Sequence, residues 1–268
     1  MYYNVFSGAK VGSILIVGGG ISGVQAALDC ADLGFKVYLV EKGPSIGGHM
    51  SLLDKTFPTN DCSMCILSPK LSDCERNPNI EIMTMSEVRQ VEGVLGHYKV
   101  RVRNNPRYVD PEKCSVCGEC VTQCPRIITD PYNQDMVTTK AVHVHFPQAI
   151  PSAAYIDNRY CLYLTEKKCG ICENICPQGA IDLDAEPRER WLDVGSIIIS
   201  SGYSPFDAAK RPELGYGRYP NVMTSLEFER LLSASGPSHG HLIRPGDGKE
   251  VKRVAWIQCV GSRDRSRG

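Results

Sequence analysis

The sequence predicts an α/β fold in which one domain is interrupted by a cysteine-rich insertion. Three observations lead to this prediction. A glycine-rich turn joins an apolar strand to an amphipathic helix near the start of the chain. Eight of the thirteen cysteines fall within residues 114–176. A buried-strand pattern then returns at residues 194–201. We therefore expect three segments: residues 1–109, 110–187 and 188–268.

The elements of the α/β part follow from hydrophobic periodicity. The apolar run at residues 13–17 is a strand, and apolar residues recur at helical spacing from Ile21 to Gly34. Residues 35–40 form a second strand, which gives a β-α-β opening. Residues 43–80 contain loop and short helix. Further strands are expected at residues 80–83, 98–103, 194–201 and 251–257, with a short amphipathic helix at 221–233.

Composition excludes several classes of protein. The 268 residues contain 30 basic and 30 acidic side chains, so no net charge attracts nucleic acid or an anionic membrane. No apolar run approaches the roughly 18 residues that a membrane helix needs. The start lacks the features of a secretory signal. We expect a cytoplasmic protein with no nucleic-acid partner and no membrane span.

The glycine turn has the spacing Gly18-x-Gly20-x-x-Gly23. In this context Gly18 permits a tight turn, Gly20 admits a pyrophosphate and Gly23 lets helix and strand pack closely. Glu41 ends the second strand, where a carboxylate accepts ribose hydroxyls. The alternative is a glycine turn beside an unrelated acid. We favour a dinucleotide site, because the structural context and the acid agree.

The motif alone does not separate FAD from NAD. Two features resemble FAD proteins: the strand 194–201 closed by Gly202, and the pair Gly47-Gly48 after the acid. The expected cofactor-binding residues are Gly18, Gly20, Ile21, Ser22, Gly23, Glu41, Lys42, Gly47, Gly48, His49 and Gly202.

The cysteines of the insertion form two similar runs, each ending in Cys-Pro. The first has the spacing of bacterial ferredoxins, in which three cysteines bind one [4Fe–4S] cluster and the fourth binds the other. In the second run Glu166 occupies the first cysteine position, and Cys161 replaces it if a short loop bulges out. The expected ligand sets are Cys114, Cys117, Cys120 and Cys176 for one cluster, and Cys161, Cys169, Cys172 and Cys124 for the other. Structural zinc is the alternative.

Other cysteines and histidines carry weaker signals. Cys62 and Cys65 are the candidate catalytic residues, as a redox-active pair or as cluster ligands together with Cys74; a packed loop without redox chemistry explains them equally well. Cys259 alone would be a core residue. His143 and His145 share one strand face, and a solvated hairpin is favoured over a metal site.

Several strings resemble the A subunit of heterodisulfide reductase and its homologues in anaerobic bacteria and archaea. They extend over nearly the whole chain. The strings are VGGGISG (17–23), VEKGPSIGGHM (40–50), KTFPTNDCSMCILSPK (55–70), RNPNIE (76–81), RYVDPEKCSVCGECVTQCP (107–125), HFPQAIPSAAYID (145–157), KCGICENICPQGAI (168–181) and WIQCVGSRD (256–264).

The resemblance implies a thioredoxin-reductase-like, Rossmann-like FAD-binding domain, with its first part at residues 1–109 and its second part within 188–268, where a second dinucleotide-type domain would also start. An α+β ferredoxin domain with two [4Fe–4S] clusters would be inserted at 110–187. It also implies an oxidoreductase subunit that passes electrons between flavin and clusters. Such subunits act with other subunits of a heterodisulfide reductase-like complex and with a ferredoxin or hydrogenase-type donor. Flavin-based bifurcation toward disulfide reduction is part of the family's chemistry.

The family continues beyond the string that contains Cys259, adding cysteines that complete a further cluster. This chain ends at Gly268, so we expect a fragment or a short homologue. The alternatives are an iron–sulfur electron-carrier module without a working flavin site, and an iron–sulfur flavoprotein resembling the small subunit of glutamate synthase. The latter needs a nicotinamide domain, for which the residues after 250 are too few.

Overall fold

The computed structural model describes residues 12–263 and divides into two compact units. The first unit comprises the residues up to Ser51, Cys65–Ile128 and Thr139–Gly202. The second comprises Leu52–Met64, Thr129–Thr138 and the residues from Tyr203. Residues 1–11 and 264–268, the outer ends of the predicted segments, lie outside the described part.

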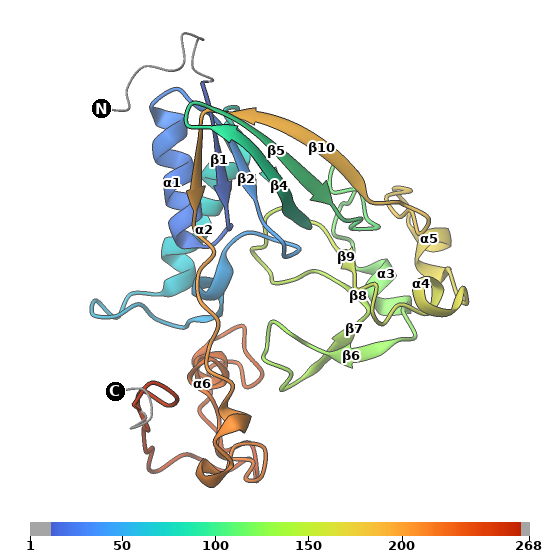
Figure 1. Cartoon of the computed structure of the whole chain (residues 1–268). Coiled ribbons are helices and arrows are strands. Elements are labelled where there is room, and N and C mark those ends of the chain that lie inside the picture. The colour runs from blue at the N-terminus through green and yellow to red at the C-terminus, as the bar shows by residue number, and fades with distance from the viewer. Residues whose placement is uncertain (1–11, 264–268) are drawn as a thin grey trace, which may run out of the picture. The chain divides into compact units, whose positions relative to one another are not determined.

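The first unit is built on a parallel four-stranded sheet with the order β11-β1-β2-β3. Its strands are β1 (Ser13–Val17), β2 (Lys36–Val40), β3 (Ile80–Met83) and β11 (Ser196–Ile199). Helix α1 (Ile21–Asp32) connects β1 to β2, as the periodicity predicts. Helices α1 and α2 (Ser63–Arg76) lie beside this sheet (Figure 1). This is the β-α-β opening that the sequence predicts.

An antiparallel sheet with the order β10-β5-β4 packs on the parallel one. It consists of β4 (Ser86–Val94), β5 (His97–Asn104) and β10 (Arg188–Val194). The shared core contains Leu15, Val40, Val100, Val102, Leu192 and Val194, all nearly inaccessible to solvent. The sequence predicts β5 but not β4, whose residues after Glu87 are mostly exposed and whose valines recur at every third position instead of every second. Apolar periodicity cannot reveal such a strand.

The chain between β5 and β10 forms only short helices and strands. They are α3 (Glu119–Gln123), β6 (Ile127–Thr129), β7 (Thr138–Lys140), β8 (Val142–His143), β9 (Tyr155–Ile156), α4 (Leu162–Glu166) and α5 (Ile171–Ile175). Strand β6 pairs with β7, and β8 pairs with β9. A small apolar core that includes Val142, Ile156 and Leu183 lies among them, with six of the cysteines packed against it.

The second unit contains the 3₁₀ turns η2 (Ala208–Lys210) and η3 (Pro212–Leu214) and helix α6 (Ser225–Leu232). Thr224 begins α6 with a capping box, in which its side chain accepts from the Glu227 amide and the Glu227 side chain accepts from the Thr224 amide. The fully buried Arg230 donates to Asn133 Oδ1 at 3.2 Å and to the Leu52 carbonyl at 3.3 Å. This arginine therefore joins three separate stretches of the chain.

The predicted strand at residues 251–257 is wrong. This stretch has no regular secondary structure, and Trp256 and Ile257 are 60% and 64% exposed. An apolar run becomes a strand only where a neighbouring strand supplies hydrogen-bond partners. Among the described residues, the nearest pairing is a single bridge between Ile243 and Glu250.

The core between the two sheets gives a stability prediction. Leu15→Ala removes a fully buried side chain, and we expect it to lower the free energy of unfolding by about 2–5 kcal/mol. Leu95→Ala, at a position 77% exposed, should change it by less than about 0.5 kcal/mol. Urea unfolding followed by Trp fluorescence measures both. Equal losses in the two variants would contradict this account of the core.

Candidate functional site

The glycine turn follows β1 and requires glycine at two positions. Gly18 has φ +109°, and a Cβ there would lie 2.1 Å from the Ser200 carbonyl oxygen. A Cβ on Gly23 would lie 1.9 Å from the Gly18 carbonyl oxygen. Larger residues at these sites would push β11 or α1 away from the turn. The tight turn and the close helix–strand packing predicted from the sequence are both present.

Gly20 is less crowded. It precedes the first residue of α1, and the nearest atom to a Cβ built there is Gly48 Cα at 3.9 Å. No side chain caps this end of α1, and its first turn contains no acidic residue. Amide N–H groups at a helix N-terminus attract anions. The geometry fits the pyrophosphate of a dinucleotide.

Glu41 lies at the end of β2 and closes over the turn. One carboxylate oxygen accepts a hydrogen bond from the Gly19 amide and the other from the Gly43 amide, each at 2.7 Å. An ionised carboxylate has about four acceptor positions. Two remain for the hydroxyls of a ribose, so Glu41 can hold the turn in place and bind the nucleotide at the same time.

The second glycine pair lies directly beside the first turn. The Gly47 amide donates to the Gly19 carbonyl at 2.7 Å, and Gly47 forms a parallel bridge with Gly20. Gly48 has φ +56°, and a Cβ there would lie 2.8 Å from Gly20 Cα. The expectation that Gly47 and Gly48 belong to the cofactor site agrees with this juxtaposition.

The remaining predicted cofactor residues lie around these turns. Ile21 is half-buried and Ser22 exposed in the first turn of α1, and Lys42 is exposed after Glu41. His49 is half-buried in the 3₁₀ turn η1 (Gly48–Leu52). Gly202 follows β11 with φ +69°, and no described atom lies within 4 Å of a Cβ built on it. Their contacts with a cofactor stay a prediction.

Arg107 links the glycine loop to the cysteine-bearing segment, and sequence reasoning missed it. Its guanidinium donates to the Ala154 carbonyl at 2.9 Å, to the Ala153 carbonyl at 2.6 Å and to the Pro44 carbonyl. Burial lowers the pKa of Arg107 to about 10, although Cys114 and Tyr155 oppose the shift. The only available signal is a basic residue shortly before the predicted boundary between residues 109 and 110.

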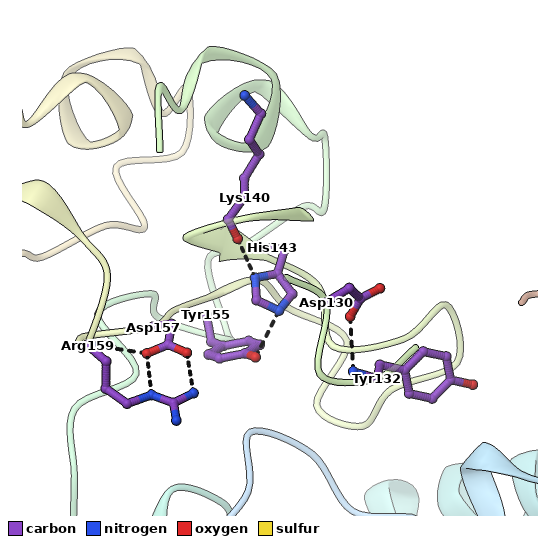
Figure 2. A network of polar contacts seen from close by, with 7 residues as sticks. All are labelled: Asp130, Tyr132, Lys140, His143, Tyr155, Asp157 and Arg159. Atoms are coloured by element: carbon purple, nitrogen blue, oxygen red, sulfur yellow. Dashed lines mark hydrogen bonds and ion pairs between the residues drawn. The ribbon is translucent and has the colours of Figure 1, made fainter. Parts of the chain in front are cut away.

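Two histidines extend this connection. His143 is 4% exposed, so the expectation of a solvated hairpin face is wrong for it. Its Nδ1 donates to the Lys140 carbonyl at 2.7 Å, and its Nε2 accepts from the Tyr155 hydroxyl at 2.8 Å (Figure 2). The carbonyl can only accept, so Nδ1 carries a proton. His145 Nδ1 lies 2.6 Å from Ser45 Oγ on the glycine loop.

Asp157 organises the approach to Cys161. Its carboxylate accepts two hydrogen bonds from the Arg159 guanidinium, at 3.0 and 2.6 Å (Figure 2). Burial alone would raise the pKa of Asp157, but the bonds from Arg159 outweigh it and lower that pKa. The Asp157 carbonyl accepts from the Cys161 amide at 3.0 Å. The second cysteine run therefore starts from a fixed turn.

One cavity is lined by one of the predicted ligand sets. Cys124, Cys161, Cys169 and Cys172 all border it, together with apolar side chains such as Val142 and Leu183. Helix α4 occupies the interval between Cys161 and Cys169. The residues by which the second run is longer than the first therefore form one short helix. Cys161, just before this helix, lines the cavity in place of the first cysteine of the pattern, whose position in the sequence is occupied by Glu166.

A second cavity is lined by the other set: Cys114, Cys117, Cys120 and Cys176. Each cavity thus takes three cysteines from one run and the fourth from the other. Burial raises the pKa of Cys120 to about 11 and that of Cys172 to about 12, and neighbouring thiols raise both further. Ligation to metal removes these protons, so the two donor sets suit a cationic group.

The thiols of each set line a cavity without meeting at one point. Among the described residues, no three Cys, His, Asp or Glu side chains converge closely enough to hold a single metal ion. Zinc and [4Fe–4S] clusters both use cysteine thiolates as ligands, so the group that these sets would bind stays a prediction.

The other cysteines are placed differently. Cys62 and Cys65 are joined in a disulfide at the start of α2, and the remaining eleven cysteines, all within the described range, are free thiols. Cys74 is fully buried, and burial raises its pKa to about 12. Cys259 is exposed, which corrects its assignment to the core.

Comparison with known proteins agrees with this geometry. The model of the family described as FAD-dependent oxidoreductases matches residues 13–154. The chain is 50% identical, over 95% of its length, to the A subunit of the H2:CoB-CoM heterodisulfide, ferredoxin reductase of Methanothermobacter marburgensis, and covers 38% of that protein. It is 52% identical, over 94% of its length, to an iron-sulfur A subunit of the CoB–CoM heterodisulfide reductase of Methanopyrus kandleri, and covers 37% of that protein. The chain spans well under half the length of these relatives.

A solved structure of L-proline dehydrogenase from P. horikoshii is 26% identical over 38% of this chain and 21% of its own, with a TM-score of 0.30. That likeness is too distant to bear on the site. In the part of the chain that the structure describes, no helix has both the length and the apolar character of a membrane span.

The uncrowded surroundings of Gly20 give the second prediction. Gly20→Ala adds a methyl group where the pyrophosphate must approach, so we expect FAD affinity to fall about tenfold or more, with little change in the stability of the FAD-free protein. Gly12→Ala is the control, because it faces open space away from the turn. Isothermal titration with FAD measures both. Unchanged affinity in Gly20→Ala would place the cofactor elsewhere.

The hydrogen bonds of Arg107 give the third prediction. Arg107→Met leaves two buried carbonyls and one half-buried carbonyl without their donor, and we expect it to lower the free energy of unfolding by about 2–5 kcal/mol. Arg76→Met, at an exposed position in the last turn of α2, is the control and should change little. Thermal and urea unfolding measure the difference. A loss below about 1 kcal/mol in Arg107→Met would mean that these bonds do not hold the two segments together.

Proposed function

The chain belongs to the family of FAD-dependent oxidoreductases, and we propose that it is the flavin- and iron–sulfur-containing electron-transfer part of a heterodisulfide reductase-like complex. Residues 110–187 would be an inserted ferredoxin domain with two [4Fe–4S] clusters, and FAD would lie at the glycine turns. The same unit carries both sites.

One observation supports this proposal most: the crossed distribution of cysteines between the two cavities. Cys124 borders the cavity of the second run and Cys176 that of the first. Two-cluster ferredoxins exchange their fourth ligand in this way. Two unrelated zinc sites would give no reason for the exchange. The crossing also holds the two cavities at a fixed separation, as electron transfer between two clusters requires.

The residues of the chain itself have separable tasks. Gly18, Gly20 and Gly23 let backbone approach the pyrophosphate, and Glu41 orients the ribose. Bound FAD supplies the ability to exchange electrons singly with iron–sulfur clusters and in pairs with other donors and acceptors. The hydrogen bonds of Arg107 fix the glycine loop against the cysteine-bearing segment. Buried apolar residues such as Val142 and Ile156 shield the cluster cavity from water.

The partners follow from the relatives. Their names describe subunits of enzymes that act on the CoB–CoM heterodisulfide, and one includes ferredoxin. We propose that this chain likewise acts with other subunits and exchanges electrons with a ferredoxin or hydrogenase-type protein, in the cytoplasm. Cys259 would bind a further cluster only together with cysteines from outside this sequence.

Anaerobic purification with quantified flavin and iron tests the proposal. We expect about one FAD and about eight iron atoms per chain. Cys120→Ser and Cys172→Ser should each remove about four iron atoms, because they belong to different sets. Cys30→Ser is the control, since Cys30 lies on α1 away from both cavities, and should keep all eight.

Three outcomes would overturn the proposal. Iron without flavin would leave an electron-carrier module, and zinc in place of iron would remove the redox chemistry altogether. Loss of all iron from a correctly folded single variant would mean that the two sets are not independent sites.

A further inference from the structure

The disulfide between Cys62 and Cys65 stands apart from the other cysteines. Both half-cystines are exposed, and they close a Cys-Ser-Met-Cys turn at the start of α2. Such a short ring ties together no distant parts of the chain, so it adds little stability by constraining the unfolded state. The bond therefore needs another explanation.

Helix α2 carries this turn to the cofactor cradle. Leu67, two residues after Cys65, lies with its Cδ2 3.6 Å from the position of a Cβ on Gly47. Further along, Lys70 Nζ donates to Gln25 Oε1 of α1 at 2.6 Å, and Cys74 Sγ donates to the Val24 carbonyl at 3.7 Å. Within the first unit, α2 from Cys65 onward thus packs beside the loop that contains Gly47 and Gly48.

The geometry does not favour a metal site formed with Cys74. Cys74 lies nine positions after Cys65 along the helix, an axial rise of about 13 Å. Cys74 is also fully buried and bonded to a carbonyl of α1. One cluster could not reach both ends of this stretch, so Cys62 and Cys65 are left as a pair.

We propose that Cys62 and Cys65 form a dithiol/disulfide couple that exchanges two electrons with FAD bound at the adjacent glycine turns. In the reducing direction, the two electrons of the reduced flavin enter the S–S bond. The bond breaks, two protons complete two thiols, and the flavin becomes oxidised. The reverse reaction forms the bond and reduces the flavin. This inference rests on the proposed FAD site.

Two local features suit such a couple. Cys62 directly precedes the first helical residue of α2, where amide groups and the helix dipole stabilise a thiolate, the reactive form in disulfide exchange. Both sulfur-bearing residues are exposed, so a thiol or disulfide of a second molecule can reach them. A pair of this kind could pass two electrons onward without involving the clusters.

The test is an anaerobic reductive titration of the FAD-loaded chain with dithionite. Samples are taken during flavin bleaching, alkylated with iodoacetamide and analysed by peptide mass spectrometry. We expect alkylation of Cys62 and Cys65 to rise together and to track the loss of flavin absorbance. Cys74 is the internal control and should stay unlabelled, because it is buried and its thiol pKa is about 12.

Variants separate the couple from the rest of the protein. The double variant Cys62→Ser, Cys65→Ser should accept two electrons fewer per chain than the wild type while keeping its flavin and about eight iron atoms. Cys30→Ser should titrate like the wild type. In Gly20→Ala protein prepared without FAD, the pair should stay oxidised over the same course of titration.

The outcomes distinguish this inference from the proposed function. A chain that binds no FAD fails the proposed function, which flavin quantification reveals before the titration. If FAD binds and is fully reduced while Cys62 and Cys65 stay unlabelled, the couple alone is refuted. Equal labelling with and without FAD, or a loss of about four iron atoms in the double variant, would also overturn it.

Discussion

The close approach of two glycine backbones is the constraint on which the cofactor site depends. The Gly47 amide donates to the Gly19 carbonyl at 2.7 Å, and Gly48 approaches Gly20 so closely that a Cβ would lie 2.8 Å from its Cα. These contacts bring the loop after β2 onto the turn after β1. Glu41 completes the arrangement by accepting from amides on both sides. Together, the two loops and Glu41 form an arrangement at the end of the parallel sheet that suits a nucleotide.

The same loop is also the attachment point for the cysteine-bearing segment. The Ile46 amide donates to the Ile150 carbonyl at 3.0 Å, and Arg107 donates to carbonyls on both segments. A guanidinium among carbonyls remains charged although burial lowers its pKa. The carbonyls replace the water that the cation has lost. Shifting the inserted segment would therefore leave a buried charge and several acceptors unpaired, which favours a single arrangement.

Much of this architecture was predictable because it follows from local rules. Strands β1 and β2, helix α1 and the glycine spacing are readable from periodicity and turn chemistry, and the crossed cysteine sets follow from ligand spacing. The strand predicted at residues 251–257 was wrong, because an apolar stretch becomes a strand only where another strand is available to pair with it. Arg107 and the burial of His143 stayed hidden for a related reason. Their partners lie outside any local sequence pattern, and no such pattern marks a long-range hydrogen bond.

Gly47 lies where the glycine loop, the inserted segment and helix α2 meet. A Cβ placed there would meet Phe146 of the inserted segment at 3.4 Å and Leu67 of α2 at 3.6 Å. One backbone position is therefore flanked by the segment that carries the two cysteine-lined cavities and by the helix that begins with the disulfide. A flavin can exchange electrons singly or in pairs. A cofactor on this loop would lie near both groups, as the proposed exchange of electrons with clusters and with the disulfide requires.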